Sequence, residues 1–191
     1  MPRKFLFTRE QIVDAALEIT RERGISAVTA RALGERLGAS SKPIFSQFES
    51  MDEVLAAVRE AAEARYQSTL AAAMERAEEL PYKASGMAYI RFAKEERELF
   101  KLLFMRDRTG EAIEDGRASL QPLLALIEQK TGMSEEEAYR FHLEMWIYVH
   151  GIATMAATAY LNWPEDSISD MLSDAFWGLQ ERFRKKREAN G

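Results

Sequence analysis

The sequence has no cysteine and, among its 191 residues, only two histidines, His142 and His150. Without cysteine, neither a disulfide framework nor a thiolate metal site can form, and a reducing cytoplasm is the expected compartment. The two histidines do not have a metal-binding spacing, and neither adjoins a candidate nucleophile. We therefore expect no metal site.

The sequence also lacks the patterns of common catalytic sites. It has no glycine-rich phosphate loop, no paired catalytic carboxylates and no nucleophile–histidine–acid triad. The acidic run Glu135–Glu137 fits the first turn of a helix, where carboxylates favour the exposed amide groups. We expect no enzyme activity and no cofactor, although an all-α enzyme remains an alternative that would need polar groups converging in the C-terminal part.

A membrane span is a further possibility to consider, because no charged residue occurs from Met145 to Trp163. That length is close to a transmembrane helix. However, Thr154, Thr158 and His150 would be costly in lipid, and no cationic flank marks an orientation. A helix that is apolar on most sides is then better explained by burial between its own domain and a partner subunit.

Charge is divided unevenly along the chain. Up to Phe48 there are eight Lys or Arg and five Asp or Glu, a net charge of +3. The rest of the chain has eighteen and twenty-six, a net charge of −8. A basic end on an acidic body suits a protein of which one end meets phosphate, although chance asymmetry is the simpler alternative.

The basic end contains the pattern of a helix-turn-helix, from Thr29 to Phe48. Thr29 can cap a first helix, and Gly38 can end it in the left-handed conformation that glycine tolerates. Ser40 or Ser41 is expected to cap a short second helix. The alternative from the pattern alone is a helical hairpin capped by serines.

Within the expected second helix, Pro43 fits the first turn, where no amide donor is needed. Ile44, Phe45 and Phe48 are expected to point to the core. The outward face would carry small hydroxyls, an amide and one cation, which suit base edges and phosphates in a major groove. These outward residues are Ser41, Lys42, Ser46 and Gln47.

The segment from Phe7 to Leu55 resembles the DNA-binding module of the tetracycline-repressor (TetR) family of bacterial regulators. The matching residues are Thr8, Ile12, Ala15-Ala16-Leu17, Gly24, Val28-Thr29, Leu33, Leu37-Gly38-Ala39-Ser40, Ile44-Phe45, Phe48 and Leu55. The chain departs from the family where an aromatic hydroxyl, a histidine and a lysine usually hold phosphates. It has Phe45, Gln47 and Met51 at these positions, and only Gln47 can donate to a phosphate oxygen.

The pattern and the resemblance together predict an all-α protein with two domains. Residues 1–50 would form a helix-turn-helix DNA-binding domain, and residues 51–191 a helical ligand-binding and dimerisation domain. The residues expected to contact double-stranded DNA are Thr29, Arg31, Ser40, Ser41, Lys42, Pro43, Ser46 and Gln47. The alternative is a family member with a decayed reading head, that is, a helix-turn-helix that no longer binds DNA. Such a protein would act through protein or ligand binding only.

The C-terminal part is rich in methionine and aromatic side chains, which can form a plain core or line a cavity for an organic ligand. The stretch with Trp146 and His150-Gly151 resembles a C-terminal domain type of the same family. A small apolar effector would contact some of Phe92, Phe104, Met105, Trp146, His150 and Met155. For His150, a hydrogen-bonded structural role is the alternative to ligand sensing.

The last two helices are expected to form the dimer interface. We expect Ser167 or Ser169 to cap the final helix, whose apolar face includes Leu172 and Phe176. Two such helices from each subunit would make a four-helix interface across a two-fold axis. The expected function is a homodimeric, cytoplasmic DNA-binding regulator, a repressor that binds an inverted repeat and is released by the effector.

Overall fold

The computed structural model describes residues 6–77, 80–107, 109 and 117–190, and this part of the chain is helical, without strands. The α-helices and the two short 3-10 helices are α1 (Arg9–Arg23), η1 (Ile25–Ala27), α2 (Ala30–Leu37), η2 (Ile44–Ser46), α3 (Met51–Arg76), α4 (Pro81–Glu95), α5 (Arg97–Phe104), α6 (Arg117–Thr131), α7 (Glu135–Ala157) and α8 (Glu165–Asn190). The expected all-α fold is confirmed.

The chain divides into two compact units. Residues 1–68 and 95–106 form the first unit, and residues 69–94 and 107–191 form the second. These units are defined by contacts, whereas the boundary expected after residue 50 concerns function, and that assignment stays a prediction. The first unit therefore includes α5, which comes from the later part of the sequence.

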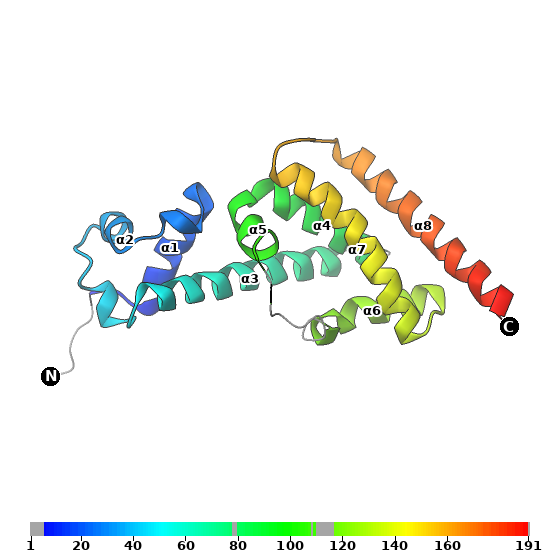
Figure 1. The fold of residues 1–191 in the computed structure, drawn as a ribbon, viewed down its shortest axis with the longest axis horizontal. Coiled ribbons are helices and arrows are strands. Elements are labelled where there is room, and N and C mark those ends of the chain that lie inside the picture. The colour runs from blue at the N-terminus through cyan, green and yellow to red at the C-terminus, as the bar shows by residue number, and fades with distance from the viewer. Residues whose placement is uncertain (1–5, 78–79, 108, 110–116, 191) are drawn as a thin grey trace. The chain divides into compact units, whose positions relative to one another are not determined.

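Local signals set the helix boundaries of the first unit. Thr8 begins α1 with a capping box: its hydroxyl accepts from the Gln11 amide, and the Gln11 side chain accepts from the Thr8 amide. Gly24 ends the helix with a φ of 81°. α1 packs against both α2 and α5, and α1 and α2 lie next to the start of α3 (Figure 1). The completely buried apolar side chains of this unit include Ile12, Ile19, Leu33, Ile44, Val54, Val58, Leu99 and Phe100.

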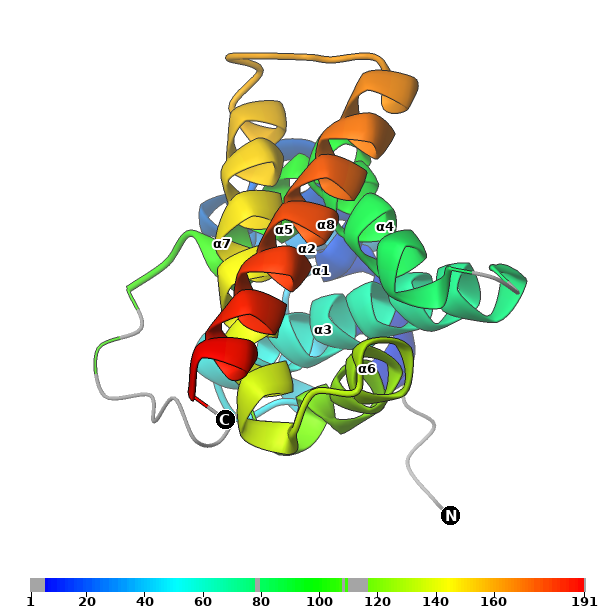
Figure 2. The ribbon, with the colours of Figure 1, turned by 90° about the vertical axis from the view of Figure 1, so that its right-hand side faces the viewer.

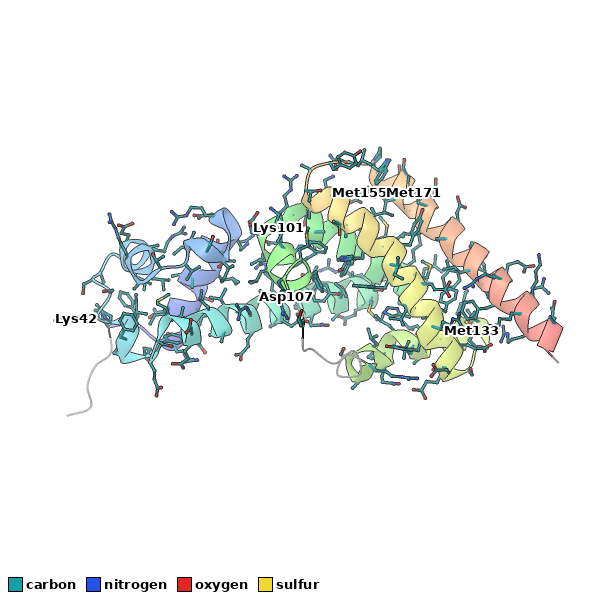
Figure 3. The ribbon with its side chains drawn as sticks, in the orientation of Figure 1. Lys42, Lys101, Asp107, Met133, Met155 and Met171 are labelled. Atoms are coloured by element: carbon teal, nitrogen blue, oxygen red, sulfur yellow. The ribbon has the colours of Figure 1, made fainter. Side chains whose placement is uncertain are left out.

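The second unit contains α4, α6, α7 and α8. α7 packs against both α6 and α8, and α7 and α8 run side by side (Figure 2). Met133, between α6 and α7, belongs to a cluster of apolar side chains where these helices meet (Figure 3). The buried members of that cluster are Leu124, Ile127, Met133, Ala138, Phe141, Met145 and Phe183.

Two boundaries in the second unit differ from the sequence-based expectation. α7 begins with a capping box at Ser134 but ends at Ala157, so the uncharged segment continues beyond the helix. α8 begins at Glu165, directly after Pro164, and Ser167 and Ser169 lie inside it, so the expected serine cap is wrong. None of the helices in the described part of the chain is long and apolar enough to cross a membrane.

Candidate nucleic-acid interface

The first helix of the expected helix-turn-helix is α2. The Thr29 hydroxyl caps it by accepting from the Ala32 amide at 3.1 Å. Gly38 ends it in the left-handed conformation, with φ 66° and ψ 30°. Both boundaries agree with the sequence pattern, because a cap and a left-handed terminal glycine act within one helical turn.

The turn after α2 is held close to that helix at Gly34. The Ala39 amide donates to the Gly34 carbonyl at 2.9 Å. A Cβ atom at position 34 would lie 2.8 Å from the Ala39 carbonyl oxygen, which is too close for any side chain to fit without a backbone shift. Glycine is thus needed at position 34 for its small size, a requirement that the sequence pattern did not indicate.

The second element is shorter than expected. It consists of a turn and the 3-10 helix η2, in which the Ile44 amide donates to the Ser41 carbonyl and the Gln47 amide donates to the Ile44 carbonyl. No side chain caps η2, so the predicted serine cap is also wrong. In a 3-10 helix each turn takes three residues, and only a short segment of chain faces outward.

Burial along η2 also corrects one core assignment. Ile44 and Phe48 are buried, as the pattern predicts, but Phe45 is 47% exposed. The pattern assumed the 3.6-residue period of an α-helix, which places residues 44, 45 and 48 on one face. The 3-10 helix has three residues per turn, so Phe45 points toward solvent instead of the core.

Most of the expected DNA-contacting side chains are exposed. Lys42 lies at the outer edge of the first unit, between α2 and α3 (Figure 3), and forms no ion pair with any residue that the structure describes. The Ser46 hydroxyl donates to the Pro43 carbonyl at 2.6 Å. Of the expected set, the exposed residues are Thr29, Arg31, Ser40, Lys42 and Ser46, and the half-buried residues are Ser41, Pro43 and Gln47.

Two of these residues have intramolecular partners that limit their role. The side-chain amide of Gln47 donates to the Phe7 carbonyl at 3.1 Å. Arg31 forms an ion pair with Glu35 on the next turn of α2, at 2.8 Å. The Glu35 hydrogen bond raises the pKa of Arg31, whose guanidinium stays charged in either case. Each keeps further N–H donors, but the present partner restricts where the side chain can reach.

Arg9 is a positioning residue that the sequence analysis missed. Its Nη1 atom donates to the Gln47 carbonyl at 3.3 Å and to the Glu53 carboxylate at 2.7 Å. Its guanidinium carbon lies 4.1 Å from the centre of the Phe48 ring. The Glu53 carboxylate also accepts from the Glu49 amide at 2.7 Å, and this bond, followed by Arg9, lowers the pKa of Glu53. The charged pair thus holds the end of the turn over residues 41–48, which we call the reading turn, against α1 and α3.

The residues expected at an effector site fall into both compact units. Phe104 belongs to the first unit, where its ring packs edge-on against Tyr66 with centroids 5.0 Å apart, and Met105 follows it. Phe92, Trp146, His150 and Met155 belong to the second unit. The structure therefore groups four of the six residues within one unit, and the effector site stays a prediction.

His150 is joined to two aromatic side chains of the second unit. Its Nδ1 atom lies 2.9 Å from the Tyr89 hydroxyl, and its ring stacks on Trp146 with centroids 4.8 Å apart. Burial lowers the pKa of His150, which favours the neutral imidazole. The other histidine, His142, is buried and pairs with the Tyr82 hydroxyl at 3.1 Å. Both imidazoles thus have hydroxyl partners.

The arrangement of the first unit is that of a helix-turn-helix DNA-binding protein. Residues 12–58 match the profile of bacterial regulatory proteins of the tetR family. Residues 82–175 match the profile of the tetracyclin repressor-like C-terminal domain. The chain therefore belongs to the TetR family of transcriptional regulators, which confirms the resemblance found in the sequence.

Solved structures agree with this fold. A TetR-like transcriptional regulator from Rhodococcus sp. RHA1 is 18% identical, with a TM-score of 0.64 over 88% of this chain and 93% of that chain. A protein from Pseudomonas aeruginosa PAO1, described as a transcriptional regulator, is 15% identical, with a TM-score of 0.66 over 91% of this chain and 90% of that chain. At these identities the likeness concerns the fold alone. No curated protein matches the sequence.

Proposed function

We propose that this TetR-family regulator is a homodimeric, cytoplasmic repressor that binds an inverted-repeat operator and is released by a small apolar effector. The observation that carries the proposal is the first unit's exposed turn. There Lys42, which has no ion-pair partner among the described residues, stands beside exposed serine hydroxyls. Such groups can bind phosphates and base edges.

Dimerisation is supported by the outer faces of α7 and α8. Ile147 on α7 is 67% exposed and Trp177 on α8 is 56% exposed. Gly151 and Gly178 have no atom within 4 Å of the position that a Cβ would take, so a partner helix could approach closely there. Two-fold symmetry of the protein requires an inverted repeat, with reading turns about 34 to 36 Å apart.

Effector release rests on the second unit. It contains buried Phe92 and the group of Tyr89, Trp146 and His150, in which two aromatic rings contact an imidazole that burial keeps toward its neutral form. This chemistry suits a mostly apolar molecule with one polar group. An effector that fits only the form with low DNA affinity would shift the population toward that form by its difference in affinity for the two forms.

A second function is favoured by a specific observation in the reading turn. Gln47 uses its side-chain amide for Phe7, and the side chains of Phe45 and Met51 have no group that can donate to a phosphate. A protein with a decayed head would keep the fold and would act through protein or ligand binding only.

One experiment separates the two functions. The full chain is incubated with random-sequence duplex DNA, and the bound fragments are recovered and sequenced through several rounds. Enrichment of an inverted repeat, with binding that weakens as salt rises, supports the proposal, because each neutralised phosphate adds to the salt dependence. No enrichment, together with equal weak binding to all duplexes, would establish the decayed head instead.

The effector half needs its own experiment. Hydrophobic compounds are screened for a rise in the melting temperature, and each hit is added to the protein bound to its selected DNA. Release of DNA by a stabilising compound supports the mechanism. Compounds that stabilise the protein and leave its DNA affinity unchanged would refute the coupling.

A further inference from the structure

Phe45 stands in the middle of the reading turn with its phenyl group 47% exposed. Single exposed apolar residues are common on protein surfaces, so exposure alone assigns no role. The position matters more: Phe45 follows buried Ile44 and precedes exposed Ser46, in the segment matched to the tetR profile. It is the largest exposed apolar side chain of that turn.

The backbone that carries Phe45 is held in place by hydrogen bonds and by its buried neighbours. The Ile44, Gln47 and Phe48 amides all donate to carbonyls within the turn. Arg9 binds the Gln47 carbonyl at 3.3 Å. Ile44 and Phe48, on either side of Phe45 in the sequence, are buried in the core. The backbone position from which the Phe45 side chain projects is therefore set by contacts within the unit.

Lys42 lies three residues before Phe45, in the turn that leads into η2. Lys42 is exposed, like Phe45. A cation and a phenyl group are thus both exposed in this short segment, as a site for a partner that is both anionic and partly apolar.

The DNA major groove has this combination. Its edge is lined by phosphates, and its apolar group is the C5-methyl of thymine, which phenylalanine is suited to contact. A phenyl group has no hydroxyl, so Phe45 cannot donate to a phosphate as an aromatic hydroxyl would. We infer that Phe45 contacts the C5-methyl group of one thymine in each half-site and selects thymine there. This inference rests on the proposed function.

The test changes only the methyl group. On the inverted repeat selected from random-sequence DNA, each thymine is replaced in turn by deoxyuridine, which keeps the pairing with adenine and lacks the methyl. Dissociation constants are measured by fluorescence anisotropy with the full chain. We expect one symmetry-related pair of thymines to matter, with affinity falling about threefold to fourfold for one methyl and about tenfold for both.

Two variants assign the effect to its residue. Phe45→Ala should bind the thymine and deoxyuridine duplexes with equal affinity, because the phenyl group that contacts the thymine methyl is gone. Lys42→Ala is the matched control: it should weaken binding to both duplexes and keep their ratio. Since Phe45 is half-exposed, its variant is expected to fold, and an unchanged thermal melt checks this.

Each outcome decides the inference. A selected repeat without thymine, deoxyuridine substitutions without effect, or a Phe45→Ala variant that keeps the full thymine preference would overturn it, while leaving the proposed function standing. A protein that enriches no repeat from random-sequence DNA would refute the proposed function and this inference with it. A single thymine pair that loses its effect only in Phe45→Ala would establish the contact.

Discussion

The Glu96 carboxylate receives two hydrogen bonds from Arg21, one from Nε at 2.6 Å and one from Nη2 at 2.7 Å. Arg65 of α3 donates to the same carboxylate at 2.7 Å. Only 11% of the Glu96 side chain is exposed. Glu96 directly follows the end of α4 in the sequence. Its carboxylate links Arg21 of α1 to Arg65 of α3 within the first unit.

Replacing Glu96 with Gln should destabilise the first unit. Hydrogen bonds to charged groups contribute about 1.5 to 3 kcal/mol, and the substitution removes the buried carboxylate shared by Arg21 and Arg65, which leaves Arg21 with Glu18 alone. We expect the free energy of unfolding at pH 7 to fall by about 2 kcal/mol, measured by urea denaturation. Glu60→Gln is the control, because Glu60 is exposed on α3, and it should change stability by no more than a few tenths of a kcal/mol.

The same variant predicts a change in pH dependence. Burial alone would raise the pKa of Glu96, but the hydrogen bonds from Arg21 and Arg65 outweigh burial and lower it below its ordinary value. A carboxylate with a lowered pKa stabilises the fold above the ordinary glutamate pKa of about 4.3, and this stability is lost as pH falls through the lowered pKa. Glu96→Gln should therefore lose less stability than wild type between pH 5 and pH 3. Parallel curves for the two proteins would contradict this role.

Gly34 should tolerate no side chain. In Gly34→Ala the new Cβ would meet the Ala39 carbonyl, a backbone atom that cannot rotate away. We expect the free energy of unfolding to fall by about 1 to 3 kcal/mol, as in other overpacked sites, and DNA binding to be lost because the turn is displaced. Gly38→Ala is the comparison, since it meets no atom and adds only backbone strain of about 1 to 2 kcal/mol. If Gly34→Ala bound DNA as well as Gly38→Ala, the tight approach would have no functional role.

His142 should make stability depend on pH above the range in which carboxylates titrate. Burial lowers its pKa to about 4, so the folded protein holds it neutral beside Tyr82. The unfolded chain takes up a proton near the ordinary pKa of about 6.5, so the stability from neutral His142 is complete above that pH and is lost as pH falls toward 4. The loss between pH 7 and pH 4 is on the order of 3 kcal/mol.

His142→Gln tests this by keeping a hydrogen-bond partner for Tyr82 while removing the titration. Its unfolding free energy should vary less than that of wild type between pH 7 and pH 4. Urea denaturation at several pH values measures the difference, and a variant that follows the wild-type curve would show that His142 carries none of the dependence.

Several helix boundaries, including the predicted ones at Thr29 and Gly38, depend on local groups. Thr8, Thr29 and Ser134 each accept from an amide three residues away. Gly24 and Gly38 have the positive φ angles that other residues avoid. Such signals are complete within one turn of chain, so no knowledge of tertiary contacts is needed to find them.

The site residues were harder to predict because their environment is not local. The segment from Ile44 to Phe48 is too short for its apolar spacing to distinguish an α-helix from a 3-10 turn. Assuming an α-helix led to the wrong prediction that Phe45 is buried. The partners Arg9 and Glu53 are 44 residues apart, and Arg21 and Glu96 are 75 apart. Ion pairs between distant residues have no periodicity, so no sequence pattern indicates them.

The outer faces of α7 and α8 provide the last prediction. Ile147 and Trp177 are exposed in the single chain, so replacing either with Glu should leave the fold of each subunit intact. If these faces meet in a dimer, each substitution places two charges near the two-fold axis without a partner, which strongly disfavours association. We expect light scattering at micromolar concentration to find a dimer for wild type and a monomer for Ile147→Glu and Trp177→Glu.

Tyr160→Glu is the matched control for these two variants. Tyr160 is 76% exposed but lies in the segment between α7 and α8, outside both helices, so this variant should remain dimeric. The monomeric variants should also bind a half-site and the full inverted repeat with similar affinity, because the second reading turn is no longer attached. Wild type that is monomeric at the same concentration, or two dimeric Glu variants, would show that the interface lies elsewhere.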